Sequence, residues 1–117
     1  MSVHSLDHAF IALADPTRRQ VIDLLRKHPR RAGELVAASS VSAPAMSRHL
    51  RILRRSGLIE ETEIPDDARV RLYRLRPEQF VSMQSWLNDV QSFWSGQLNA
   101  FKAHVESKPR KIKAPRK

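Results

Sequence analysis

The feature that most constrains the fold is the segment Ser42–Gly57, which carries helix signals at both ends. Ser42 is a preferred N-cap residue, and Pro44 is tolerated in the first helical turn, where a missing N–H costs little. Gly57 is the residue type that most often follows a helix C-terminus, because it adopts positive φ without strain. The segment therefore predicts a helix with well-defined ends.

The expected helix has two distinct faces. At 100° per residue, Met46, Leu50 and Leu53 fall within about 60° of one another, which predicts a buried stripe. The opposite face carries polar and basic residues and a proline: Pro44, Ser47, Arg48, Arg51 and Arg55. An arginine-rich helix face is often only a solvated surface, so the neighbouring segments decide its meaning.

Those neighbours predict a known supersecondary structure. A short helix over 33–38 and a polar turn over 39–42 come directly before the segment. Two strand-like runs, 58–64 and 70–75, follow it and are joined by a turn-forming stretch, 65–69. A short helix, a tight turn, a second helix and a hairpin together predict a helix-turn-helix with a wing.

The remaining chain adds three helices. A helix over 3–14 ends at Asp15-Pro16, and the same pair begins a second helix that runs to about Lys27. Pro77 opens a last helix that ends near Glu106. The expected fold class is mainly α with a small β-hairpin: a winged helix-turn-helix of about five helices and a two-stranded wing. Residues 1–106 form the expected domain, and residues 107–117 form a basic tail without regular structure.

Composition limits the possible partners. The 117 residues carry a net charge of +9, which favours nucleic acid first and a membrane surface second. The tail accounts for six of these positive charges, so residues 1–106 have a net charge of only +3. The chain has no cysteine and no apolar run of transmembrane length. No signal peptide is expected, and a cytoplasmic location is expected.

The polar helix face has the chemistry of DNA readout. Arg48 can donate a bidentate pair to guanine, and Ser47 can contact a base edge or a phosphate. Arg51 and Arg55 lie further along and are expected to meet backbone phosphates. The exposed amides at the helix start can hold a phosphate oxygen. The full expected DNA-contacting set includes the wing: Ser42, Ala43, Pro44, Ser47, Arg48, His49, Arg51, Arg55, Arg69 and Arg71. For His49, which lies nearer the apolar stripe, a packing role is favoured over direct readout.

Five pieces of the chain, in this order and spacing, resemble the ArsR/SmtB family of winged helix-turn-helix repressors: Ala14–Arg19, Gly33–Leu35, Ser42–Leu53, Gly57–Ile59 and Leu72–Leu75. The resemblance covers about residues 5–106. It implies a homodimer that binds a near-palindromic operator and usually represses transcription. It also places the wing arginines, Arg69 and Arg71, close to a minor groove. The alternative for the wing is an ordinary charged hairpin edge that discourages strand addition.

The last helix carries an apolar stripe that is too long for a small monomer to cover. It contains five of the chain's seven aromatic residues. Together with one face of the first helix, it predicts a dimer interface made of Leu6, Phe10, Leu13, Leu87, Val90, Trp94, Leu98 and Phe101. A close approach of helices would explain Gly96 within it. The alternative is that the stripe lines an effector pocket.

No metal site, cofactor or enzyme activity is expected. The stretch that holds cysteines in metal-sensing members of the family is Glu34–Ser39 here, without a thiol, which suggests a metal-independent member. The pattern of the last helix resembles a subgroup often encoded beside START-like ligand-binding proteins, which would fit autoregulation. Two other functions remain open: a winged helix that binds another protein, and a non-specific nucleic-acid binder driven by the tail. The sequence does not identify a small-molecule effector.

Overall fold

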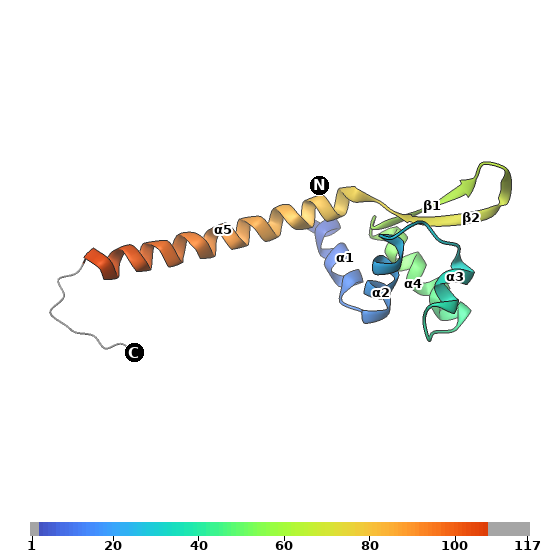
Figure 1. The fold of residues 1–117 in the computed structure, drawn as a ribbon, viewed down its shortest axis with the longest axis horizontal. Helices are drawn as coiled ribbons and strands as arrows, with labels where there is room; N and C mark the ends of the chain where they lie inside the picture. The colour runs from blue at the N-terminus through green and yellow to red at the C-terminus, as the bar shows by residue number, and fades with distance from the viewer. Residues whose placement is uncertain (1–2, 108–117) are drawn as a thin grey trace. The chain divides into compact units, whose positions relative to one another are not determined.

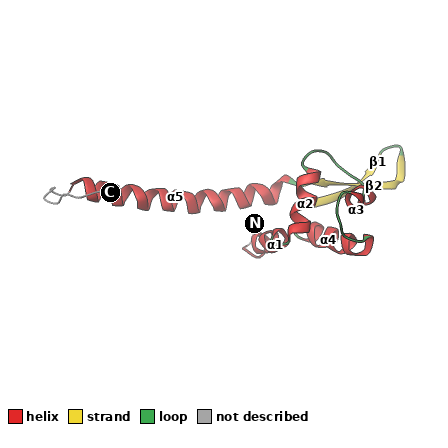
Figure 2. Cartoon of the chain, turned by 60° about the horizontal axis from the view of Figure 1, so that its bottom comes forward, coloured by secondary structure: helices red, strands yellow, loops and turns green. Residues whose placement is uncertain are grey.

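The computed structural model describes residues 3–107. Its elements follow the order α1 (Val3–Leu13), α2 (Pro16–Leu25), α3 (Ala32–Ala37), α4 (Ala43–Arg55), β1 (Ile59–Ile64), β2 (Asp67–Leu75) and α5 (Pro77–Ser107) (Figure 1). Figure 2 colours the helices red and the strands of the two-stranded sheet yellow. The mainly helical fold with one hairpin, predicted from the sequence, is confirmed.

The chain divides into two units, with the boundary between Gln84 and Ser85. The first unit contains α1–α4, the hairpin and the start of α5. The second contains the rest of α5, and the expected tail lies outside the described residues from 108 onward. The expectation of one folded domain over residues 1–106 stays a prediction.

Both ends of α4 have the local chemistry that the sequence predicted. The Ser42 hydroxyl accepts a hydrogen bond from the Ala45 amide at 3.3 Å. Gly57 has a φ of 75°, and the Leu58 amide donates to the Leu53 carbonyl at 3.1 Å. This is the left-handed termination that glycine allows without strain.

The hairpin was predicted correctly, but its turn was not. β2 begins at Asp67 rather than at residue 70, so the expected five-residue turn is wrong. Ile64 pairs with Asp67 whereas Glu63 pairs with Arg71, and this register shift takes up the extra residues within β2. Such a bulge shortens the turn itself to Pro65-Asp66. Other bounds differ by one or two residues; α2, for example, ends at Leu25 rather than near 27, and α3 spans Ala32–Ala37 rather than 33–38.

A hydrophobic core joins the helices of the first unit to the base of the hairpin. It is built by Ala9, Ala12, Val21, Leu25, Leu35, Met46, Leu50, Leu53, Leu58, Ile59 and Met83. Over residues 5–13 of α1, whose side chains are described, the fully buried residues are therefore two alanines. The larger residues Leu6, Phe10 and Leu13 are partly buried against the same core. The α1 surface that these three residues offer to a partner is thus smaller than the sequence pattern suggested.

The hairpin is held beside the start of α3 by a short bridge. The Arg30 amide donates to the Tyr73 carbonyl at 3.1 Å, and the Tyr73 amide donates to the Arg30 carbonyl at 2.8 Å. The Arg76 amide donates in turn to the Leu58 carbonyl at 3.0 Å. These bonds determine where the arginines of β2 lie relative to α4.

Candidate nucleic-acid interface

The polar face of α4 points away from the core. Met46, Leu50 and Leu53 are buried. The residues expected to face DNA are exposed: Ser42, Ala43, Pro44, Ser47, Arg48, Arg51 and Arg55. The two faces that helical periodicity predicted are confirmed, and the exposed one is open along the length of the helix.

His49 is half-buried and is linked to the start of α2. Its Nδ1 lies 3.2 Å from Nη1 of Arg18 and 3.9 Å from Oδ2 of Asp15. Because a guanidinium can only donate, Nδ1 accepts in this contact, and a neutral His49 then carries its proton on Nε2. This contact supports the positioning role that the sequence favoured for His49, since it connects α4 to α2.

Asp15 caps α2 and faces the same cluster. Burial acts to raise the pKa of Asp15, but the hydrogen bonds from the Arg18 and Thr17 amides and the charge of Arg18 outweigh it. The net effect lowers the pKa of Asp15 from 3.8. The carboxylate is therefore the favoured form in the folded chain.

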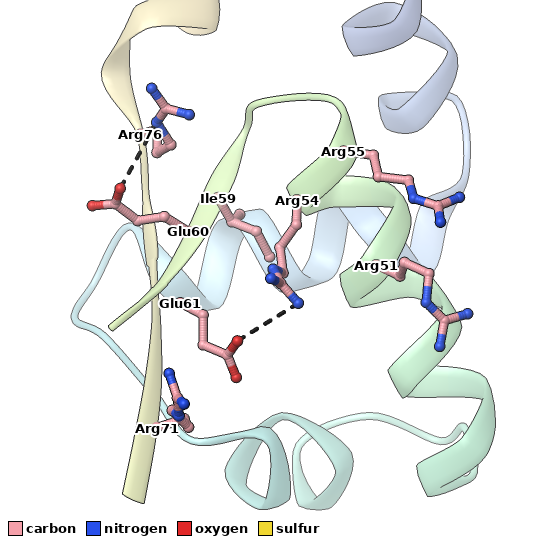
Figure 3. A pocket seen from close by; sticks show the side chains of 8 residues that line it. All are labelled: Arg51, Arg54, Arg55, Ile59, Glu60, Glu61, Arg71 and Arg76. Atoms are coloured by element: carbon pink, nitrogen blue, oxygen red, sulfur yellow. Dashed lines mark ion pairs between the residues drawn. The ribbon is translucent and has the colours of Figure 1, made fainter. Parts of the chain in front are cut away.

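A hollow of about 620 Å³ lies between the C-terminal half of α4 and the hairpin. Five arginines, two glutamates and one isoleucine line it: Arg51, Arg54, Arg55, Ile59, Glu60, Glu61, Arg71 and Arg76 (Figure 3). We call it the arginine hollow. Its lining carries more positive than negative charge, which suits an anion.

Some of these arginines have carboxylate partners and others do not. Arg54 lies 3.6 Å from Glu61, and Arg76 lies 3.8 Å from Glu60; Figure 3 draws both pairs as dashed lines. Among the described residues, Arg51 and Arg55 have no acidic side chain within ion-pair distance. In the close-up their guanidinium groups point away from the two glutamates. Arg71 also has a distant partner, Glu63 at 3.7 Å, so the hollow joins two unpaired arginines to three that are loosely paired.

The wing arginines lie in different surroundings. The Arg69 side chain is 91% exposed, and its Nε lies 3.3 Å from Oδ1 of Asp67 near the hairpin turn. Arg71 is half-exposed, lies 3.7 Å from Glu63, and also lines the arginine hollow. Arg71 thus belongs to the same surface as the α4 arginines, whereas Arg69 stands apart near the turn.

Sequence reasoning missed two arginines of this surface. Arg54 lies seven residues after Ser47, hence only about 20° from it around the helix, so the periodicity of α4 could have found it. Arg76 gave no such signal, because its place depends on how the hairpin docks on the helices. Both residues line the hollow beside Arg51 and Arg71.

Glu61 is held in place by a second partner. The Tyr73 hydroxyl lies 3.4 Å from Oε2 of Glu61 and donates to it. Burial and the Glu61 charge raise the pKa of Tyr73, although Arg54 and Arg71 act in the opposite direction. Tyr73 therefore stays a neutral donor, which keeps the Glu61 carboxylate beside Arg54.

The second unit carries the apolar surface that the sequence singled out. Large hydrophobic side chains are exposed along it: Trp86, Leu87, Phe93, Trp94, Leu98, Phe101 and Val105. The Phe93 and Trp94 rings meet edge to face, with their centroids 5.8 Å apart. Val90 is half-buried. An exposed aromatic surface of this kind is typical of an interaction site.

Two further findings concern other kinds of site. Among the side chains that the structure describes, no three histidines, aspartates or glutamates converge as a metal site would require. No helix in the same range has both the length and the hydropathy needed to cross a membrane.

The comparisons with known proteins agree on one family. Residues 15–61 match the model of the family "Bacterial regulatory protein, arsR family". The HTH-type transcriptional regulator Rv2034 of Mycobacterium tuberculosis is 34% identical over 103 residues, which cover 88% of this chain and 91% of that protein. The transcriptional repressor SdpR of Bacillus subtilis is 36% identical over 56 residues, 48% of this chain and 62% of that protein.

Solved structures agree with this assignment. An ArsR-like transcriptional regulator from Rhodococcus sp. RHA1 superposes with a TM-score of 0.74 at 28% identity, covering 90% of this chain and 96% of that one. A homodimeric winged helix-turn-helix DNA-binding domain from Mycobacterium bovis shares the fold, with a TM-score of 0.59 at 22% identity over 84% of this chain and 85% of that one. The exposed face of α4, the wing beside it and these relatives lead to one conclusion: the chain belongs to the arsR family of bacterial regulatory proteins and is a DNA-binding transcriptional regulator with a winged helix-turn-helix fold.

Proposed function

We propose that this regulator is a homodimeric repressor that binds a near-palindromic operator, with α4 of each subunit in the major groove. The observation that carries the proposal is the exposed polar face of α4, which ends beside the arginine hollow and the wing. In a helix-turn-helix, the residues at the N-terminal end of the second helix reach the base edges. Here these are Ser47 and Arg48, both exposed.

The roles of the other residues follow from their positions. Arg51 and Arg55 lie one and two turns beyond Ser47 and would contact backbone phosphates. The Ala43 amide at the start of α4 would hold a phosphate near the helix N-terminus, since Pro44 has no N–H and the Ala45 amide donates to Ser42. Arg69, near the hairpin turn, would approach the minor groove. His49 would act through Arg18 by orienting α4 rather than by touching a base.

Dimerisation would bring two α4 helices to one face of the DNA. The exposed α5 residues Leu87, Trp94, Leu98 and Phe101 support a dimer interface, since water would otherwise cover a broad apolar surface. From α1 the partly buried Leu6, Phe10 and Leu13 would contribute their outer edges, and half-buried Val90 would join them. The Mycobacterium bovis domain with this fold is described as homodimeric. Two reading helices about 34 Å apart would fit successive turns of the double helix.

Repression is proposed on two grounds. The relative SdpR is named a transcriptional repressor, and a dimer bound across a promoter blocks polymerase without further contacts. The chain would act in the cytoplasm, where bacterial DNA lies, and without a metal or enzyme activity of its own. Autoregulation would be the simplest circuit for such a small repressor.

The proposal is tested by selecting duplexes that the full chain retains from a pool of random DNA. Repeated selection should enrich one recurring sequence with two related halves whose centres lie about one helical turn apart. The selected duplex should bind more tightly than a scrambled duplex of equal length at two salt concentrations. A pool that remains random after selection would refute sequence-specific binding. Loss of all binding after removal of residues 107–117 would favour a tail-driven binder instead.

A further inference from the structure

We propose that the arginine hollow binds a phosphodiester of the DNA backbone, and that Glu61 competes with this phosphate for Arg54. The inference rests on the proposed placement of α4 in the major groove. It adds a second set of residues, Arg54, Arg76 and Glu61, which control how strongly the protein binds any DNA.

The position of the hollow follows from groove geometry. If α4 lies in a major groove and the hairpin reaches the neighbouring minor groove, the strand that separates the two grooves must cross between them. That crossing point is the space between the C-terminal half of α4 and the hairpin, where the arginine hollow lies (Figure 3). Its 620 Å³ equals the liquid volume of roughly twenty water molecules, enough for a hydrated phosphodiester.

The ion pairs in the hollow are loose enough to exchange. Charge-assisted hydrogen bonds between nitrogen and oxygen have lengths of about 2.7–2.9 Å. The Arg54–Glu61 distance is 3.6 Å, and the Arg54 side chain is 49% exposed. By contrast, Arg74 holds Glu60 at 2.6 Å on the same hairpin. Arg54 can therefore turn from its carboxylate to an incoming phosphate, whereas Arg74 and Glu60 stay bound to each other.

The Glu61 side chain is held in place even when the Arg54 side chain turns toward a phosphate. The glutamate side chain is only 23% exposed, and the Tyr73 hydroxyl donates to its carboxylate at 3.4 Å. Its backbone pairs with Tyr73 in the hairpin as well. The carboxylate thus stays within reach of Arg54 and competes with the phosphate for it, whatever the base sequence.

This arrangement would limit non-specific affinity. A phosphate contact contributes equally on all DNA sequences, so any weakening of it leaves the preference for the operator intact. Glu61 would therefore lower the affinity for random DNA and for the operator by the same factor. The benefit is that fewer molecules are held on the many non-specific sites of a genome.

The test compares Glu61→Gln and Arg54→Gln in the full chain, on the selected and the scrambled duplex, over a range of salt concentrations. Glutamine keeps the shape of Glu61 and an oxygen for Tyr73 but removes the charge. We expect Glu61→Gln to bind both duplexes several-fold more tightly. Arg54→Gln should bind both several-fold more weakly, and the slope of log K against log salt should become shallower by about one.

The double variant separates a specific competition from a general charge effect. Glu61→Gln should give little gain once Arg54 is already glutamine, because the freed arginine is absent. Asp23→Asn is the matched control: it removes one negative charge from an exposed pair with Arg26, 3.4 Å away in α2. It should leave both affinities nearly unchanged. A gain from Glu61→Gln that persists in the double variant, or that Asp23→Asn reproduces, would overturn the competition.

A second experiment tests whether the arginine hollow binds a free anion rather than the DNA backbone. Inorganic phosphate and chloride are compared as competitors at equal ionic strength. We expect equal loss of DNA binding with both salts. Stronger displacement by phosphate that disappears in Arg54→Gln would assign the hollow to a free phosphate compound and overturn the backbone assignment.

The failures of the two proposals are distinguishable. If the wild-type chain enriches no sequence, the operator proposal fails and this inference fails with it. If the wild-type chain enriches an operator but Arg54→Gln binds with unchanged affinity and salt slope, only the hollow is wrongly assigned.

Discussion

Gln79 of α5 donates its side-chain amide to the main-chain carbonyl of Ser56, 2.8 Å away, at the end of α4. The same amide nitrogen also donates to the carbonyl of Ser5 in α1 at 3.2 Å. A Cβ added at Gly57 would lie 3.1 Å from Cγ of Gln79, so this side chain packs against the turn that ends α4. One buried glutamine thus joins three elements at the base of the DNA-reading helix.

Replacing Gln79 with methionine should destabilise the fold by about 1–3 kcal/mol, although the side-chain volume is nearly kept. The reason is that two carbonyls lose their donor in a buried place. Urea unfolding monitored by circular dichroism measures the change. Asn99→Met, on the exposed surface of the same helix, should change stability by less than about 0.5 kcal/mol. Equal effects of the two changes would contradict the role given to Gln79.

Replacing Asp15 with alanine should cost about 1 kcal/mol at neutral pH, because α2 loses its N-cap. The pKa of Asp15 is lowered from 3.8 in the folded chain, so its carboxylate stabilises the fold above that pH and ceases to do so as the pH falls through the folded value. The difference between the wild type and Asp15→Ala should therefore be constant from pH 7 to about 5 and shrink below about pH 4. Urea unfolding at several pH values measures it. A difference that grows in acid would contradict the sign of the pKa shift.

Gly96→Ala should strengthen α5 by about 1 kcal/mol, because glycine is a poor helix former. A Cβ at this position would meet no atom within 4 Å, and Gly96 lies roughly 180° around the helix from Leu87. The close helix approach that its sequence position suggested concerns a partner helix and stays a prediction. Thermal unfolding measures the gain in stability, and the dimer dissociation constant of the variant tests the approach of a partner helix. Weaker dimerisation of Gly96→Ala would show that a partner helix does approach at Gly96.

Leu98→Lys should convert the dimer into a monomer, since it places a charge in the exposed apolar surface of α5. Leu98 is 64% exposed, so the substitution should not unfold the monomer. Sedimentation equilibrium reports the mass. The neighbouring Asn99→Lys is the matched control, because it adds the same charge about 100° away around the helix. Dimerisation that survives Leu98→Lys would place the interface elsewhere.

Local signals in the sequence were sufficient to predict the order of the helices and strands and the two faces of the reading helix. The caps at Ser42 and Asp15, the left-handed glycine at 57 and the 3.6-residue period of α4 depend on nearby residues only. They determine both the ends of the helix and the side that faces outward.

Features set by contacts distant in sequence were not predictable in this way. Arg76 reaches the arginine hollow because Tyr73 of the hairpin is bridged to Arg30, and these two residues lie far apart in the sequence. The packing of α1 through Ala9 and Ala12 was missed for another reason. Apolar patterns weight large side chains, whereas a close helix contact buries small ones completely.

The most direct test of the central claim, that α4 reads DNA through Arg48, compares the affinity of Arg48→Ala for the selected and the scrambled duplex. We expect a loss of about 1–3 kcal/mol on the selected duplex and a much smaller loss on the scrambled one, so that sequence preference falls. Arg51→Ala, in contrast, should weaken both equally. An equal loss on both duplexes for Arg48→Ala, or no loss at all, would contradict the assignment of base readout to this residue.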